Sequence, residues 1–505
     1  MMSERTVRWW PLVGIGILFV GFQVWAWVFG DRIDQMRVMI SIAVTIIGVL
    51  LALIWLLLLS RLPWKRRLLY FGLVIVTLLL VRSNFRFHGV SGNLVPILEW
   101  RWASDDAGLV GGVAALEGPV ADYPQFLGPD RDATVDGIRL ATDWEAHPPR
   151  EVWRQPVGEA WSAFAVAGDL ALTQEQRGDE ELVVAFDLAT GERVWEHAAT
   201  GRYETGIGGV GPRATPTVVE GRVFASGAMG RLTALDLETG RSIWSRDLAA
   251  EFDLTHPEWG RPGSPLAVDG MVVVSLGKAP TSSLVAVDAA SGETVWEAGS
   301  DGVGYSSPTV LTLAGRRQIV IFNRASVAGH DVETGTLLWT HPWPFEQPNV
   351  ALPVAVGTDR LLVSSGYGVG SKMLRLVASG DGFEVETLWE SPRLKAKFTN
   401  VVEYDDYIYG LDDGVMVCLD PETGERCWKR GRYGHGQVIL VGDLLLVQTE
   451  KGEVKLLEPN PDELRELSSF AALEGKTWNC PALAGRYLLV RNHLEAALYE
   501  LPVGG

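Results

Sequence analysis

The chain has 505 residues, a formal net charge of −18 and three cysteines. This length allows a large core, and so few cysteines exclude a fold held together by disulfides. The charge is unevenly divided, because the first 100 residues contain ten Lys or Arg against four Asp or Glu, whereas the remainder contains 34 against 58. A region this acidic repels phosphate backbones, so we do not expect nucleic acid as a partner.

Three apolar stretches begin the chain. We expect an anchor of residues 1–88 with membrane spans at about 10–29, 38–59 and 67–84, the third being short unless it includes flanking residues. The loop at 61–67 carries four bases and no acid, so the positive-inside rule places this loop and the N-terminus in the cytoplasm. Three spans then place the rest of the chain outside the cytoplasm. If the third stretch is interfacial, or the first is a cleaved signal peptide, that assignment fails.

Residues 89–120 form a juxtamembrane segment that ends in a stretch rich in Gly and Ala. This stretch shows no periodicity of apolar residues, so we interpret it as a flexible linker.

One sequence motif, Asp-x-x-Thr/Ser-Gly-x-x-x-Trp, recurs through residues 121–505. Alternating apolar residues precede it, so we interpret each copy as a β-hairpin. Its Asp caps the turn, its Gly adopts the left-handed conformation and its Trp fills the gap to the next sheet. The five complete copies begin and end at Asp187 and Trp195, Asp236 and Trp244, Asp288 and Trp296, Asp331 and Trp339, and Asp420 and Trp428.

Two further short strands precede each hairpin, which makes a unit of four strands in about 40–50 residues, the size of a propeller blade. Two degenerate copies end at Trp389 and Phe470, and an eighth is split between Arg486–Leu501 and the strand of Trp153 near the start. We therefore predict an all-β, eight-bladed propeller closed by a clasp of N-terminal and C-terminal strands, preceded by about three transmembrane helices.

The repeat resembles that of the pyrroloquinoline-quinone-like propeller family over about residues 121–505. The opening Tyr123-Pro-Gln-Phe-Leu-Gly-Pro-Asp-Arg-Asp132 is similar to the start of many bacterial members. That family includes quinoprotein dehydrogenases and the BamB-type scaffold of outer-membrane assembly, so the resemblance implies the fold and leaves the function open. From this resemblance, together with the three predicted spans and the basic loop, we expect a multi-pass protein of the bacterial inner membrane whose propeller faces the periplasm or extracytoplasmic space.

The dehydrogenase alternative implies pyrroloquinoline quinone with a calcium ion in the central channel, and in several members two adjacent cysteines. The chain has no adjacent cysteines, and its eight histidines show no metal-ligand spacing. Successive closing aromatics are 39 residues (Trp389 to Trp428) to 52 residues (Trp244 to Trp296) apart, which leaves little room for the insertions that build an enzyme site.

We therefore expect a non-catalytic binding or scaffold protein without a cofactor or metal, with cell-envelope assembly as one role. A sugar or alcohol dehydrogenase that uses the quinone and calcium is the alternative. Membrane-bound sugar dehydrogenases of the family also carry an N-terminal anchor of several spans, although they are longer than this chain.

The loops that enter the innermost strands should surround one mouth of the propeller channel. Aromatic and cationic residues predominate there, and such residues are common anchors of binding sites. We expect this mouth to bind a protein, peptide, glycan or anionic small molecule; the alternative is that its residues only line a solvated channel. The candidates are Trp161, Arg213, Trp259, Arg261, Tyr305, Asn349, Lys397, His435, Trp478 and Asn479.

Cys418 and Cys427 flank one hairpin turn symmetrically, so we expect them to face each other across the two strands. A disulfide fits this spacing. Two thiols are the favoured interpretation because cross-strand bridges are strained.

Overall fold

A computed structural model of the chain describes residues 7–29, 34–102, 116, 118, 120–344 and 348–504. Two compact units divide the chain, Met1–Asp105 and Asp106–Gly505, and each is described by itself. The predicted Gly/Ala-rich linker lies largely outside the described residues.

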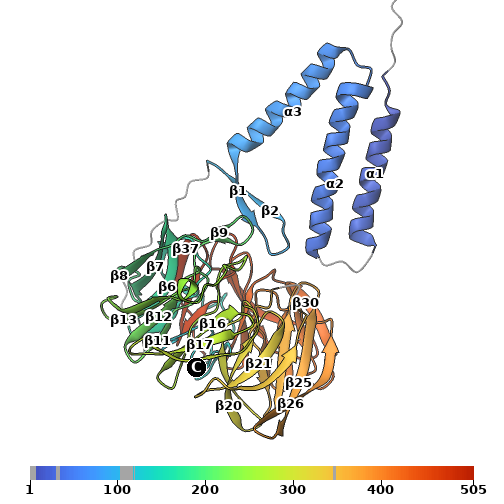
Figure 1. The fold of residues 1–505 in the computed structure, drawn as a ribbon. Coiled ribbons are helices and arrows are strands. Elements are labelled where there is room, and N and C mark those ends of the chain that lie inside the picture. The colour runs from blue at the N-terminus through green and yellow to red at the C-terminus, as the bar shows by residue number, and fades with distance from the viewer. Residues whose placement is uncertain are drawn as a thin grey trace, which may run out of the picture. The chain divides into compact units, whose positions relative to one another are not determined.

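Three helices make up most of the first unit, the helical unit (Figure 1). They are α1 (Trp10–Val28), α2 (Asp34–Ile54), which continues as the π-helix η1 (Trp55–Leu59), and α3 (Trp64–Asn84). Each is long and apolar enough to cross a membrane. The third reaches 21 residues because it includes the basic residues that precede its apolar stretch.

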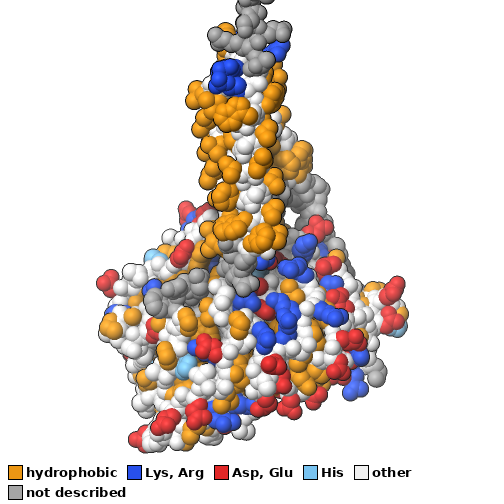
Figure 2. Space-filling model, turned by 90° about the vertical axis from the view of Figure 1, so that its right-hand side faces the viewer, with side chains coloured by type: hydrophobic (Ala, Val, Ile, Leu, Met, Phe, Trp, Pro, Cys, Tyr) orange, Lys and Arg blue, Asp and Glu red, His pale blue; other side chains and the backbone are white. Residues whose placement is uncertain are grey.

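The helices meet through polar contacts along α1 and at one end of the unit. Trp27 of α1 donates to Ser41 Oγ of α2 at 2.8 Å. At one end, Trp55 Nε1 donates to the Arg8 carbonyl at 2.8 Å, and the Arg8 amide donates to the Ser60 carbonyl at 3.2 Å. The segment before α1 therefore lies beside the loop after α2. Figure 2 shows the helical surface as mostly apolar, with Lys and Arg side chains gathered at one end.

A hairpin spans the predicted boundary between the anchor and the juxtamembrane segment. β1 (Phe85–Val90) follows α3 directly and pairs antiparallel with β2 (Pro96–Trp100).

The second unit contains, among the described residues, eight sheets of four or five strands that follow one another along the chain (Figure 1). The first four sheets are β5 (Ala165–Ala167), β6 (Leu170–Arg177), β7 (Glu180–Asp187), β8 (Arg193–Thr200); β11 (Thr217–Val219), β12 (Arg222–Ser226), β13 (Arg231–Asp236), β14 (Ser242–Asp247); β15 (Leu266–Val268), β16 (Met271–Lys278), β17 (Ser282–Asp288), β18 (Thr294–Ala298); β19 (Thr309–Leu313), β20 (Arg316–Phe322), β21 (Ser326–Asp331), β22 (Leu337–Pro342).

The remaining four sheets are β23 (Val354–Val356), β24 (Arg360–Ser365), β25 (Gly370–Ser379), β26 (Gly382–Ser391); β27 (Val402–Tyr404), β28 (Tyr407–Asp412), β29 (Val415–Leu419), β30 (Arg426–Arg432); β3 (Thr134–Val135), β31 (Gln437–Val441), β32 (Leu444–Gln448), β33 (Glu453–Glu458), β34 (Arg465–Ala471); β35 (Ala482–Ala484), β36 (Tyr487–Arg491), β37 (Glu495–Glu500), β4 (Arg150–Pro156). A short hairpin of β9 (Glu204–Thr205) and β10 (Gly209–Val210) and a helix α4 (Leu248–Glu251) lie between sheets.

The recurring sequence motif forms the predicted turn. Asp187 Oδ1 accepts from the Thr190 amide at 2.8 Å, and Gly191 has a φ of +72°. The same Asp cap and left-handed Gly occur in the other four complete copies. Because a short oxygen side chain satisfies the turn amides and glycine carries no Cβ, these residue types fit the turn.

The strand that follows the turn contains a β-bulge. Ala185 lies opposite Trp195 and Phe186 lies opposite Arg193, so Val194 is the extra residue. The same shift occurs in the other complete copies. The extra residue is exposed in four of the five copies, at Val194, Ile243, Val295 and Cys427, whereas Leu338 is buried.

The predicted direct pairing of Cys418 with Cys427 is wrong, since the bulge places Cys418 opposite Trp428. Cys427 is the extra residue of this bulge, and its side chain still neighbours that of Cys418. All three cysteines are free, with Cys418 and Cys480 buried and Cys427 exposed.

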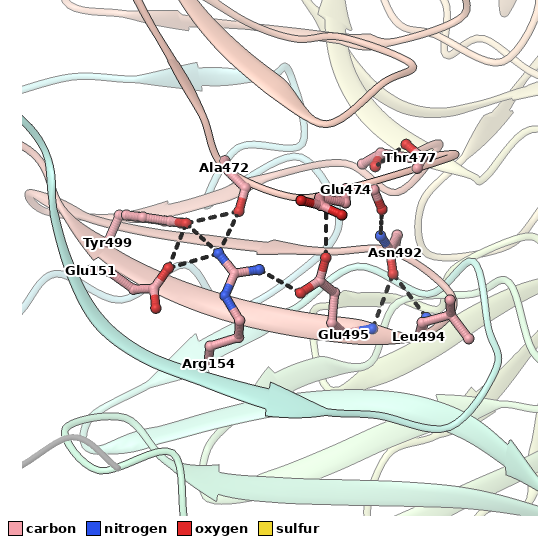
Figure 3. Close-up of polar contacts among 10 residues, drawn as sticks. Glu151, Arg154, Ala472, Glu474, Thr477, Asn492, Leu494, Glu495 and Tyr499 are labelled. Atoms are coloured by element: carbon pink, nitrogen blue, oxygen red, sulfur yellow. Dashed lines mark hydrogen bonds and ion pairs between the residues drawn. The ribbon is translucent and has the colours of Figure 1, made fainter. Parts of the chain in front are cut away.

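One sheet combines strands from both ends of the unit. β4 pairs antiparallel with β37, and Leu498 lies opposite the fully buried Trp153. Figure 3 shows the polar network that joins the two strands. Arg154 of β4 forms an ion pair with Glu495 of β37 and donates to Tyr499 Oη at 2.6 Å. The innermost strand of the same sheet, β35, contacts β5 of the first sheet.

Residues 122–141, which include the family-like opening, form a strap along the ends where the innermost strands finish. Tyr123 bridges to Val166 in β5, and the Val135 carbonyl accepts from the amide of Gly442, directly after β31. From the strap, the buried Arg131 side chain donates to the Pro265 carbonyl at 2.9 Å. Burial lowers the pKa of Arg131 to about 9. The loops that enter the innermost strands lie at the opposite ends of these strands.

Candidate functional site

Seven of the ten predicted mouth residues fall into one connected set of side chains before the innermost strands. We call this set, together with five neighbours that complete it, the mouth cluster. It comprises Trp161, Tyr203, Arg213, Trp259, Tyr305, Tyr367, Lys397, Phe398, His435, Glu450, Lys476 and Trp478.

Aromatic rings form the continuous part of the cluster. The ring centroids of Trp161 and Trp478 are 4.8 Å apart, and those of Trp478 and Phe398 are 4.9 Å apart. Phe398 continues the contact to His435 at 5.6 Å and to Tyr367 at 6.3 Å. These separations are those of favourable aromatic pairs. The five rings come from five different loops, so the cluster links loops that are far apart in the sequence.

Three cations lie over aromatic rings of the mouth cluster. Lys476 Nζ is 4.4 Å from the ring centroid of Trp478 and 4.8 Å from that of Trp161. Lys397 Nζ is 4.9 Å from the centroid of Tyr367, and the Arg213 guanidinium is 4.6 Å from that of Tyr203. The negative face of an aromatic ring stabilises a cation placed over it.

Burial changes the acid–base properties of these cations. It lowers the pKa of Lys476 to about 8 and that of Arg213 to about 10. Among the described residues, Lys476 has no hydrogen-bond or ion-pair partner, whereas Arg213 donates to the carbonyls of Gly208 and Gly211. The Lys476 ammonium therefore rests between two indole rings with its donors available.

One carboxylate orders the rings around Lys476. Glu450 Oε1 accepts from Trp478 Nε1 at 2.9 Å, and its Oε2 accepts from the His435 amide at 3.1 Å. Burial, and next the Lys397 ammonium, lowers the pKa of His435 to about 4, so this imidazole is neutral at physiological pH. The charges that act on Lys476 are therefore those of Glu450 and Arg213.

The other part of the cluster is organised around a backbone carbonyl. Trp161 Nε1 and Arg213 Nη2 both donate to the Gly208 carbonyl, at 2.7 and 2.8 Å. A Cβ at Gly208 would lie 2.9 Å from Trp259, which shows how closely that ring approaches the same loop. The Tyr305 hydroxyl lies near the Trp259 backbone.

The remaining three predicted residues are buried, and their side chains stabilise neighbouring segments through hydrogen bonds to backbone carbonyls. Arg261 donates to the Leu276 carbonyl at 2.7 Å, Asn349 to the Asn323 carbonyl at 2.8 Å, and Asn479 to the Ser162 carbonyl at 2.7 Å. Their donors satisfy backbone acceptors, which is the usual arrangement of buried polar groups.

The sequence predictions missed Tyr203, Tyr367, Phe398, Glu450 and Lys476. The sequence contained a usable signal for Phe398 and Lys476. In Lys397-Phe398 and in Lys476-Thr477-Trp478, a lysine stands close to an aromatic residue in a loop before an innermost strand. Tyr203 lies in the connection between β8 and β11, the same one as Arg213, and was not singled out there. Tyr367 and Glu450 lie in the turns between the second and third strands of their sheets, which were not searched for mouth residues.

A calcium ion needs six to eight oxygen ligands, supplied mainly by carboxylates and carbonyls. In the parts of the chain that the structure describes, no three or more His, Cys, Asp or Glu residues are grouped so that they could hold a metal ion. The mouth cluster, with its one carboxylate, does not fit the calcium-bound quinone of the dehydrogenases.

A family model described as outer membrane protein assembly factor BamB matches residues 115–252 and 179–430 of the chain. The chain belongs to this BamB family. No curated protein matches it.

Solved structures similar to this BamB-family chain have a propeller-type fold. BamB from Moraxella catarrhalis is 18% identical, with 70% of this chain and 98% of that chain covered and a TM-score of 0.52. Quinohemoprotein alcohol dehydrogenase from Comamonas testosteroni is 14% identical, with 76% and 81% covered and a TM-score of 0.56. The computationally designed Ika8 protein is 11% identical, with 72% and 100% covered and a TM-score of 0.50. At these identities the likeness concerns the fold alone.

Proposed function

We propose that this chain is a non-catalytic binding protein of the cell envelope, tethered to the inner membrane, whose mouth cluster binds a segment of a protein partner in the periplasm. The observation that carries the proposal is the cluster of ring–ring and cation–ring contacts at one end of the innermost strands. Rigid aromatic side chains supply contact area at low entropic cost, and aromatic and cationic residues are the commonest anchors of protein interfaces.

The β unit would present this cluster as a closed propeller of eight blades. The eight sheets, the pairing of β4 with β37 and the contact of β35 with β5 support closure. Closure leaves no open end of the series at which another chain could add a sheet.

The tether would have its N-terminus in the cytoplasm. Residues 61–67 contain four bases and no acid, and the contact of Arg8 with Ser60 places this loop at the same end as the start of α1. Three spans would then bring the β unit to the periplasmic side.

Lys476 indicates the chemistry of the partner. A carboxylate of the partner segment would meet the available donors of Lys476 and form a charge-assisted hydrogen bond between the two indoles. Apolar groups beside that carboxylate would stack on Phe398 and Trp478.

Site-specific photocrosslinking tests this proposal in cells. A photoreactive phenylalanine at Phe398 or Tyr367 should yield a crosslinked protein adduct, and the same residue at the exposed Val295 or Leu337 of the outer strands should not. Substituting Lys476 with Met should weaken the adduct formed from Phe398. Equal adducts from the cluster and from the outer strands would contradict a binding site at the mouth.

The quinone-dependent dehydrogenase is the second candidate, favoured by the likeness of fold to quinohemoprotein alcohol dehydrogenase. The purified full chain would be mixed with pyrroloquinoline quinone and calcium and assayed for quinone absorbance and for dye reduction by sugars and alcohols. Stoichiometric quinone binding with turnover would replace the binding proposal with the enzymatic one.

A further inference from the structure

The hairpin of β1 and β2 has one apolar face. Phe85 pairs with Trp100 and Phe87 pairs with Leu98, and because alternate residues of a strand point to the same face, these four share one face. Phe85 and Trp100 pack edge to face with ring centroids 5.1 Å apart. Phe87, Leu98 and Trp100 are 57%, 55% and 49% exposed. Arg86 lies on the opposite face.

The base and the turn of the hairpin are both held by the helical unit. At the base, the Phe85 amide closes the last turn of α3 on the Val81 carbonyl, and the Arg101 amide donates to the Asn84 carbonyl at 2.7 Å. At the turn, Gln35 Nε2 in the first turn of α2 donates to the Gly92 carbonyl at 3.0 Å.

These contacts fix the direction of the hairpin relative to the membrane. Successive spans cross a bilayer in opposite directions, so the start of α2 and the end of α3 reach the same surface. A hairpin joined to both ends lies along that surface instead of projecting from it. Tryptophan and tyrosine favour this headgroup layer because their rings are amphipathic, and Trp100 and Trp102 are both exposed.

We propose that the β1–β2 hairpin is an interfacial membrane element, with Phe87, Leu98 and Trp100 inserted among the lipids of the outer leaflet. This inference rests on the proposed membrane tether. Lipid is the occupant that the contacts favour, because both ends of the hairpin are anchored on the helical unit, whose helices are long and apolar enough to cross a membrane. Burial of exposed aromatic and leucine side chains in the interface would hold α2 and α3 together at this surface.

Fluorescence quenching by nitroxide-labelled lipids tests the inference on the full chain in lipid nanodiscs. Cys427, the exposed cysteine, is first replaced by Ser, and an environment-sensitive NBD dye is attached to Leu98→Cys or, independently, to Trp100→Cys. The matched control is Arg86→Cys on the opposite face of the same hairpin. We expect nitroxides near the headgroups to quench the dye at positions 98 and 100 several-fold more than at position 86.

A third position separates failure of the hairpin inference from failure of the tether. Ile46→Cys, on an exposed position of α2, should be quenched by nitroxides deep in the acyl chains. Quenching at position 46 with equal, weak quenching at 86, 98 and 100 would overturn the interfacial hairpin alone. An unquenched dye at position 98 with blue-shifted emission would show that protein covers the apolar face, which also overturns it. No quenching at position 46 would overturn the membrane tether itself.

Discussion

The indole nitrogen of Trp195 donates a hydrogen bond to the Leu237 carbonyl of the next sheet at 2.9 Å. The same ring covers Gly240, where a Cβ would lie 2.4 Å from Cε3 of the indole. Leu237 and Gly240 belong to the recurring turn, so the end of one repeat docks on the turn of the next. The same two contacts join Trp153 to Leu188 and Gly191, Trp244 to Ala289 and Gly292, and Trp389 to Pro421 and Gly424.

Gly240→Ala should destabilise the β unit more than Gly221→Ala. Both glycines have positive φ, +67° and +72°, but a Cβ at Gly221 meets nothing within 4 Å. Gly221→Ala therefore costs only the backbone strain, about 1 kcal/mol. Gly240→Ala must also displace Trp195, which raises the cost to about 3 kcal/mol. Urea unfolding of the full chain in detergent would measure the two midpoints. Equal midpoints would contradict the docking of Trp195 on this turn.

A comparison of Trp195→Phe with Trp296→Phe separates the contribution of the indole hydrogen bond to stability from that of ring packing. Both rings cover the glycine of the next turn, but Trp296 Nε1 is buried without a hydrogen-bond partner among the described residues. Trp195→Phe leaves the Leu237 carbonyl unsatisfied, so it should cost about 1 kcal/mol more than Trp296→Phe. The same unfolding experiment measures the difference, and a larger loss for Trp296→Phe would show that ring packing alone determines stability.

The repeat could be predicted from the sequence because its determinants are local. An Asp that caps a turn, a Gly at positive φ and a Trp four residues later are visible as letters. The bulge before each Trp was not predicted, since its extra residue is an ordinary apolar strand residue such as Val194 or Ile243 and carries no turn signal. This is why the symmetric opposition of Cys418 and Cys427 was wrong.

The candidate site was less predictable because residue type does not reveal burial. Arg213 and Asn479 are both polar residues in loops before innermost strands. Arg213 lies over the Tyr203 ring, whereas the buried Asn479 side chain donates to the Ser162 carbonyl in the loop before β5. The β1–β2 hairpin was not predicted from the sequence for a different reason. Its apolar residues alternate over only two short strands, and the Gly/Ala-rich segment that follows suggested a linker.

Arg154→Met should open the sheet shared by the two ends of the β unit. The substitution removes the cation that faces Glu151 and Glu495 and the donor to the Ala472 carbonyl, all partly buried (Figure 3). Loss of one partner from a shielded ion pair should cost about 2 kcal/mol here. Arg465→Met, which removes an exposed pair on the outer strand β34, is the control and should change little. Limited proteolysis would detect release of β4, and equal protection of the two variants would contradict the clasp.

The stability of the β unit should rise between about pH 8 and pH 10.5 through Lys476. Burial lowers the pKa of this lysine from 10.5 to about 8 in the folded state. Within that interval the unfolded chain binds more protons than the folded chain, so the free energy of unfolding increases with pH. Below pH 8 the ammonium is charged in both states, and the full cost of burying it is present.

Lys476→Met and Lys476→Arg should both lose this rise, because Met does not titrate and Arg stays charged throughout the interval. Unfolding midpoints of the full chain and of both variants at pH 7, 9 and 10.5 would measure it. If the partner carries a carboxylate, its affinity for the full chain should fall above pH 8 as Lys476 loses its proton, whereas the Arg variant should keep its own affinity. Parallel pH profiles of stability in all three chains would show that Lys476 does not titrate in this interval.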